Sequence, residues 1–68
     1  MFELALTKQD AIRTARHRSR WEPTVVFVVA SCGDTWGIAT LEFYLQNPKW
    51  FVSPPIAQFR KGRLLRKG

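Results

Sequence analysis

Residues 24–31, TVVFVVAS, constrain the fold of this 68-residue chain more than any other segment. The run is rich in β-branched residues and too short for a typical helix. Its unbroken apolar character predicts a central strand, or one buried on both faces. Cys32-Gly33-Asp34 then predicts a hairpin turn, and residues 35–41, TWGIATL, predict the returning strand. The segment therefore predicts a central hairpin over about residues 24–41.

A helix is expected before this hairpin, at about residues 8–20. Thr7 is a good N-cap, Asp10 follows three residues later, and Pro23 opposes continuation beyond residue 22. One stripe of this helix carries only small or aliphatic residues: Ala11, Ile12 and Ala15. Because the stripe is thin, we expect the helix to lie close against a sheet.

The remaining segments give weaker signals. Phe2, Leu4 and Leu6 indicate a short strand or an apolar lead-in to the helix. Residues 40–46 could prolong a strand or form a short helix capped by Thr40, and we favour a short helix or turn. Prolines make residues 47–55 irregular. Residues 56–65 alternate weakly and predict a third strand, with a break at Gly62 left open.

These elements predict a single α+β domain over residues 1–68. An N-terminal helix packs on a short antiparallel sheet made of the central hairpin and the third strand. Residues 66–68 are expected to form a mobile tail. The predicted core residues are Leu4, Ile12, Ala15, Val26, Val28, Ile38, Leu41, Phe43 and Ile56.

Charge is sorted along the chain, which has a formal net charge of +6. Residues 8–20 and 60–67 are strongly basic, whereas the segment between them is slightly acidic. Helical geometry places one basic group opposite the small-residue stripe: Arg13, Arg16, His17 and Arg20. The C-terminal cations are expected to form a flexible arm that adds phosphate contacts: Arg60, Lys61 and Arg63, followed by Arg66 and Lys67. Such a distribution predicts an anionic partner.

No catalytic constellation is apparent. His17 is the only histidine, and the sequence places no acid or nucleophile beside it. Cys32 has no neighbouring cation to stabilise a thiolate. The acids are scattered, without metal-ligand spacing, and the glycines form no phosphate loop. We therefore predict a protein without enzymatic activity, cofactor or metal.

Cys32 also bears on the cellular compartment. A single cysteine excludes an intramolecular disulfide and favours a reducing, cytoplasmic location. The longest apolar run, residues 25–30, is far below the roughly 20 residues of a membrane-spanning helix, so no integral membrane association is expected. A minor alternative is a lipoprotein processed at Cys32, after Val29-Ala30-Ser31. Cleavage there would leave only residues 32–68.

The sequence thus predicts a small basic binding module. Its first-choice partner is a nucleic acid bound mainly through phosphates, and Trp21, Trp50 and Phe51 could stack on bases if exposed. The alternative is a protein-interaction module, such as a small inhibitor or adaptor, that docks on an acidic partner surface. Convergence of the two basic segments would favour nucleic acid, as would a homodimer that doubles the basic face. An apolar patch of Trp50, Phe51 and Phe59 away from the arginines would favour a protein.

Overall fold

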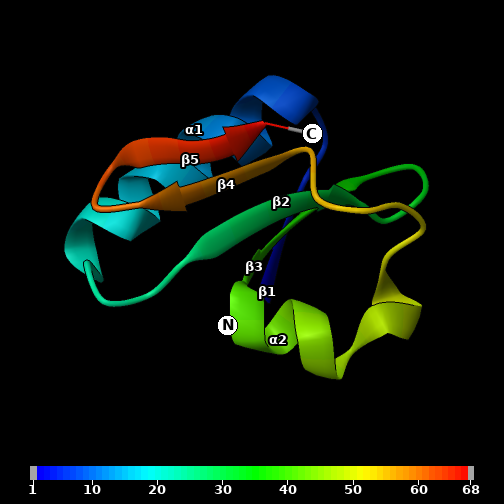
Figure 1. Cartoon of the computed structure of the whole chain (residues 1–68). Coiled ribbons are helices and arrows are strands. Elements are labelled where there is room, and N and C mark those ends of the chain that lie inside the picture. The colour runs from blue at the N-terminus through cyan, green and yellow to red at the C-terminus, as the bar shows by residue number, and fades with distance from the viewer. Residues whose placement is uncertain (1, 68) are drawn as a thin grey trace.

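The fold is α+β, as the sequence predicts: two helices cover opposite faces of one five-stranded antiparallel sheet (Figure 1). The computed structural model describes residues 2–67, with side chains for residues 2–65. The elements in chain order are β1 (Phe2–Ala5), α1 (Lys8–Trp21), β2 (Phe27–Ser31), β3 (Trp36–Thr40), α2 (Leu41–Gln46), the 3-10 helix η1 (Pro48–Trp50), β4 (Ala57–Arg60) and β5 (Arg63–Lys67). The strand order is β1-β3-β2-β4-β5, so β1 and β5 form the edges.

The predicted central hairpin is confirmed as β2 and β3, with Phe27 opposite Thr40 and Ser31 opposite Trp36. β2 also pairs with β4, and its residues 27–30 are fully buried. A strand covered on both faces is therefore what the apolar run encodes. β2 begins at Phe27 rather than at residue 24 because the Val25 N–H donates to the Glu22 carbonyl in a turn.

α1 covers one face of the sheet. The Thr7 hydroxyl accepts a hydrogen bond from the Asp10 N–H at 3.1 Å, which confirms the predicted N-cap. Ala11, Ala15 and Ser19 repeat every four residues along α1, and all three are fully buried. Their small side chains let the helix lie directly on the sheet, where Ala11 and Ala15 join Phe27 and other core residues.

α2 and η1 cover the other face, over β1, β3 and β2. The Thr40 hydroxyl accepts from the Phe43 N–H, so residues 41–46 form the capped short helix that we favoured. Phe51 packs against Val28 and neighbouring small residues of the sheet on this side. Gly37 permits this close approach, since an added Cβ there would lie 2.9 Å from the Phe51 ring.

The break left open at Gly62 is present in the C-terminal segment, whereas the single strand predicted there is not. Instead of one strand over residues 56–65, β4 and β5 form a hairpin in which Arg60 lies opposite Arg63. The two turn residues, Lys61 and Gly62, have φ angles of 55° and 76°. Positive φ at both central positions is the requirement of a type I′ turn. The expected flexible arm is therefore wrong for residues 60–65. Residues 60 and 63–65 belong to β4 and β5, and residues 61–62 form the tight turn between the two strands.

The predicted core is mostly confirmed. Ala15, Val28 and Ile38 are buried, and a further set of predicted residues is half-buried against the core: Ile12, Leu41, Phe43 and Ile56. The prediction that Leu4 belongs to the core is wrong, because its side chain is 58% exposed on the edge strand β1. Phe2, rather than Leu4, packs against the aromatic side chains on that face. Val26 lies just before β2 and is only half-buried. The predicted mobile tail stays a prediction: β5 includes residues 66 and 67, and residue 68 lies outside the described residues.

Candidate nucleic-acid interface

The predicted helix face is exposed as a unit. Because α1 buries its stripe at Ala11, Ala15 and Ser19, the remaining faces point to solvent. All four predicted contact residues on the helix are exposed: Arg13, Arg16, His17 and Arg20. The helix therefore presents its cations in the arrangement that its periodicity predicts.

The turn of the β4–β5 hairpin packs against the C-terminal half of this helix. The Gly62 N–H donates a 2.9 Å hydrogen bond to the Ser19 hydroxyl, which donates in turn to the Arg16 carbonyl at 2.7 Å. Gly62 also sits against Arg20, since an added Cβ would lie 2.6 Å from that side chain. Two segments 43 positions apart in the sequence are thus joined through a fully buried serine.

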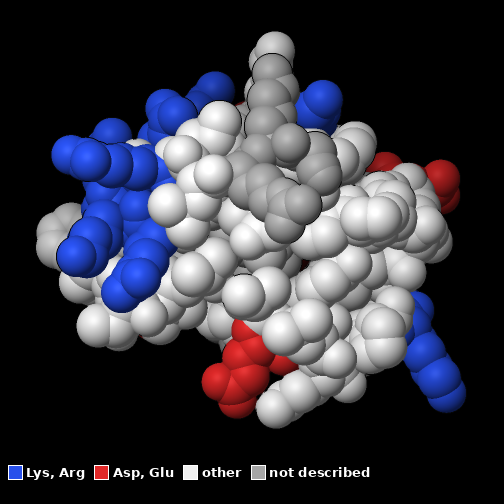
Figure 2. Space-filling view, in the orientation of Figure 1, with Lys and Arg blue, Asp and Glu red and all other residues white. Residues whose placement is uncertain are grey.

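This junction gathers five cations at one end of the molecule. We call this surface the basic end; its residues are Arg16, Arg20, Arg60, Lys61 and Arg63. The Lys and Arg side chains cluster at the left of Figure 2, over the region where Figure 1 places the β4–β5 turn and the end of α1. Two of its arginines are partly fixed. The Arg16 guanidinium lies 5.5 Å from the Phe59 ring centroid, and Arg60 Nε donates to the Pro23 carbonyl at 3.3 Å.

The cations of the basic end have no carboxylate partner among the described side chains, where Asp10 pairs with Arg13 and Glu3 pairs with Arg18. Arg60 and Arg63 also face each other across the β4–β5 pair, and like charges directly opposite in a sheet are unfavourable. A bound anion would relieve this repulsion, and arginine side chains match phosphate oxygens with paired donors.

Two grooves lie along α1. One has a volume of about 520 Å³ and follows the outward side of α1; it is lined by Arg13, Thr14, His17, Arg18, Trp21 and Glu22. A smaller one, of about 200 Å³, lies between α1 and β4–β5. Arg16 and Lys8 stand beside its apolar residues, which include Phe59 and Leu64. Each groove therefore combines apolar surface with cations.

The aromatic side chains differ in whether they are exposed enough to stack on a base. Phe51 is only 9% exposed, so it is not accessible enough to stack on a base. Phe59 is buried as well, which leaves no apolar patch of the three expected aromatics. Trp50 is 56% exposed but packs on Phe2, on the sheet face opposite α1. Trp21, at the end of α1, is 75% exposed.

Ser19, which joins the two basic segments, was not among the residues predicted from the sequence. A signal for it was present, because Ser19 continues the stripe of Ala11 and Ala15 at the same four-residue spacing. A small residue at the third position of a buried stripe is expected to meet another element. Nothing in the local sequence predicted Gly62 as the hydrogen-bond partner of Ser19.

The structure also places the two residues weighed above for catalysis, His17 and Cys32. The His17 ring accepts a hydrogen bond from the Trp21 indole N–H. Burial raises the pKa of the Cys32 thiol above its ordinary value, because desolvation disfavours the thiolate. No group of three potential metal ligands occurs in this part of the chain. Neither of its helices has the length and apolar character needed to cross a bilayer.

Comparison with known proteins found no family model, no similar curated protein and no solved structure that matches the chain.

Proposed function

We propose that this protein is a small, non-enzymatic module that binds nucleic acid through phosphate contacts at the basic end. The observation that carries the proposal is the junction of Ser19 and Gly62, which joins two basic segments into one surface. Its five cations have no carboxylate partner among the described side chains. A row of phosphates supplies many anionic groups at a spacing that several arginines and lysines can contact together.

The test is binding to mixed-sequence single- and double-stranded oligonucleotides, followed by fluorescence anisotropy across a salt series. Five phosphate contacts predict a slope of about −4.5 in log affinity against log salt for duplex DNA, and about 500-fold weaker binding at 200 mM than at 50 mM salt. Combining Arg20→Gln, Lys61→Gln and Arg63→Gln should flatten that slope to about −2.

A matched pair of single variants controls for net charge. Lys61→Gln removes a cation from the basic end, whereas Lys49→Gln removes one from η1 on the opposite side of the sheet. Lys61→Gln should reduce the magnitude of the salt slope by about 0.9, and Lys49→Gln should leave the slope unchanged. Equal effects of the two variants, or no binding at 50 mM salt, would overturn the proposal.

A protein partner with an acidic surface is the second candidate, and one observation favours it. Leu64 and Leu65 on β5 are about half exposed, directly after Arg63. Apolar side chains beside cations are common in protein interfaces. Binding with a shallow salt dependence that Leu65→Gln weakens, together with no binding to oligonucleotides, would favour this candidate.

A cytoplasmic location belongs to the same proposal. It is supported by the single free thiol, Cys32, which needs no oxidising compartment. Lipoprotein processing at Cys32 is disfavoured by the fold, because cleavage there would remove β1, α1 and β2 from the sheet. Mass measurement of the protein purified from its native cell separates the two, since processing would remove everything before residue 32.

A further inference from the structure

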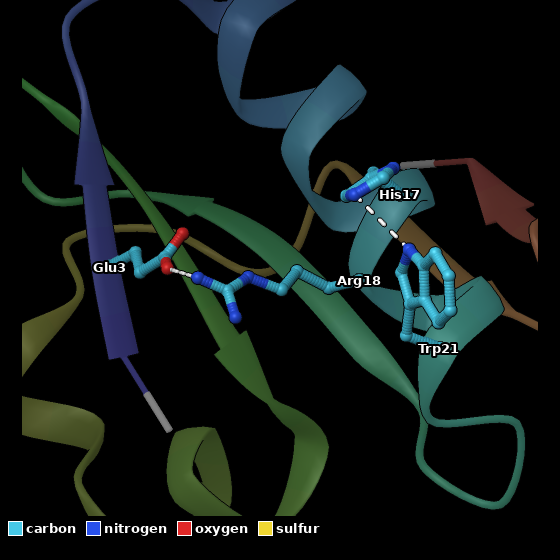
Figure 3. Close-up of polar contacts among 4 residues, drawn as sticks. All are labelled: Glu3, His17, Arg18 and Trp21. Atoms are coloured by element: carbon cyan, nitrogen blue, oxygen red, sulfur yellow. Dashed lines mark hydrogen bonds and ion pairs between the residues drawn. The ribbon is translucent and has the colours of Figure 1, made fainter.

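Trp21 is an exposed aromatic ring that is nevertheless held in place. Its side chain is 75% exposed at the last position of α1. The indole N–H donates to His17 Nε2 at 3.2 Å, and the two rings meet edge to face with centroids 6.1 Å apart. Figure 3 shows them together on the outward side of α1, while Arg18 extends the opposite way to Glu3 on β1.

The way in which Trp21 is held leaves its aromatic surface free. The hydrogen bond uses the indole edge, and the high exposure requires that ring surface remain open to solvent. A fixed ring loses little conformational freedom when a flat ligand stacks on it. Trp21 therefore has the properties of a ring that stacks on a base, rather than those of an incompletely buried core residue.

The surroundings of Trp21 fit a nucleotide. The ring lines the groove of about 520 Å³ on α1, together with Arg13 and Glu22. Arg13, His17 and Arg20 follow a four-then-three spacing, so they lie on one helix face and connect this groove to the basic end. Glu22 also lines the groove, and its carboxylate would repel a phosphate placed beside it, which favours a neutral base over Trp21.

We propose that the Trp21 groove binds a base of single-stranded nucleic acid, stacked on the indole, while the basic end holds the flanking phosphates. This inference rests on the proposed function and adds its substrate class. A duplex keeps its bases stacked inside, so an indole on the surface of a helix cannot reach a base face without unpairing it. The groove thus favours single strands over duplexes.

The test compares Trp21→Leu with Trp50→Leu, which removes an exposed tryptophan from the opposite face. Each variant is titrated at 50 mM salt with a single-stranded oligonucleotide, the corresponding duplex and inorganic polyphosphate, which has phosphates but no bases. Trp21→Leu should weaken single-strand binding about 5- to 150-fold, the range for loss of one base–aromatic stack, and leave duplex and polyphosphate binding unchanged. Trp50→Leu should change none of the three.

Trp21 fluorescence gives a second readout, because stacking on a base quenches indole emission. The quenching on adding the single strand should be large for the wild type and small for Trp21→Phe, and absent with polyphosphate. Unchanged single-strand affinity in Trp21→Leu, or equal loss toward all three ligands, would overturn the inference while leaving phosphate binding in place. Failure of the wild type to bind any oligonucleotide would overturn both the inference and the proposed function.

Discussion

Ser19→Ala should detach the β4–β5 turn from α1, because Ser19 supplies the hydrogen bond between them. The variant removes the hydroxyl that accepts from the Gly62 N–H and donates to the Arg16 carbonyl. The carbonyl keeps its ordinary helical partner, so the cost falls on Gly62, whose half-buried N–H loses its acceptor. An unsatisfied donor costs about 1–3 kcal/mol, and alanine returns about 0.5 kcal/mol through its higher helix propensity.

The net loss should therefore be about 0.5–2.5 kcal/mol in the free energy of unfolding. For a domain of this size, that loss lowers Tm by about 2–20 °C, which circular dichroism measures directly. Amide hydrogen exchange at Gly62 should accelerate more than exchange in β2 and β3, because the turn opens locally. Affinity for an oligonucleotide should fall as well, since the two basic segments are no longer held together.

Thr7→Ala is the matched control. It removes the N-cap of α1, at a cost of about 0.5–2 kcal/mol, at the end of the helix remote from the hairpin turn. It should lower Tm by a similar amount without weakening oligonucleotide binding below that temperature. Unchanged Tm and unchanged Gly62 exchange in Ser19→Ala, or equal weakening of binding by the two variants, would show that the Ser19 hydroxyl does not hold the turn on α1.

Two further predictions concern the opposite face of the sheet. Gly37→Ala should destabilise the fold by about 1–3 kcal/mol, because the added Cβ would lie 2.7 Å from Cys32 Sγ and 2.9 Å from the Phe51 ring; a wild-type midpoint in urea unfolding would contradict this close packing. Burial raises the pKa of the Cys32 thiol above its ordinary value of 9.0, so the unfolded chain releases that proton at lower pH than the folded one. Stability should therefore decline as pH rises above about 9, and subtracting the profile of Cys32→Ser isolates that decline; identical profiles for the two proteins would count against it.

Local signals accounted for the elements that the sequence predicted well. Thr7 and Pro23 bound α1 because a cap and a proline act within a few residues. The run around Phe27 predicted β2 because burial on both faces requires continuous apolar side chains. The cationic face of α1 could also be predicted, because helical periodicity places residues three and four positions apart on one face.

Elements that depend on distant pairing were predicted poorly. β1 is a four-residue strand whose existence depends on pairing with β3, more than 30 residues further along the chain. The β4–β5 hairpin has Lys61-Gly62 at its turn, without the Asn-Gly or Asp-Gly pair that most strongly signals such turns. The basic end was likewise beyond prediction as one surface, because it depends on the contact between Ser19 and Gly62.

The central claim is that both basic segments act as one surface toward nucleic acid. Titrating ¹⁵N-labelled protein with a short single-stranded oligonucleotide at low salt tests it most directly, by following amide shifts residue by residue. We expect residues 16–21 and 60–63 to shift together with one apparent affinity, while η1 around Lys49 remains unchanged. Shifts confined to one of the two segments, or largest around η1, would contradict it.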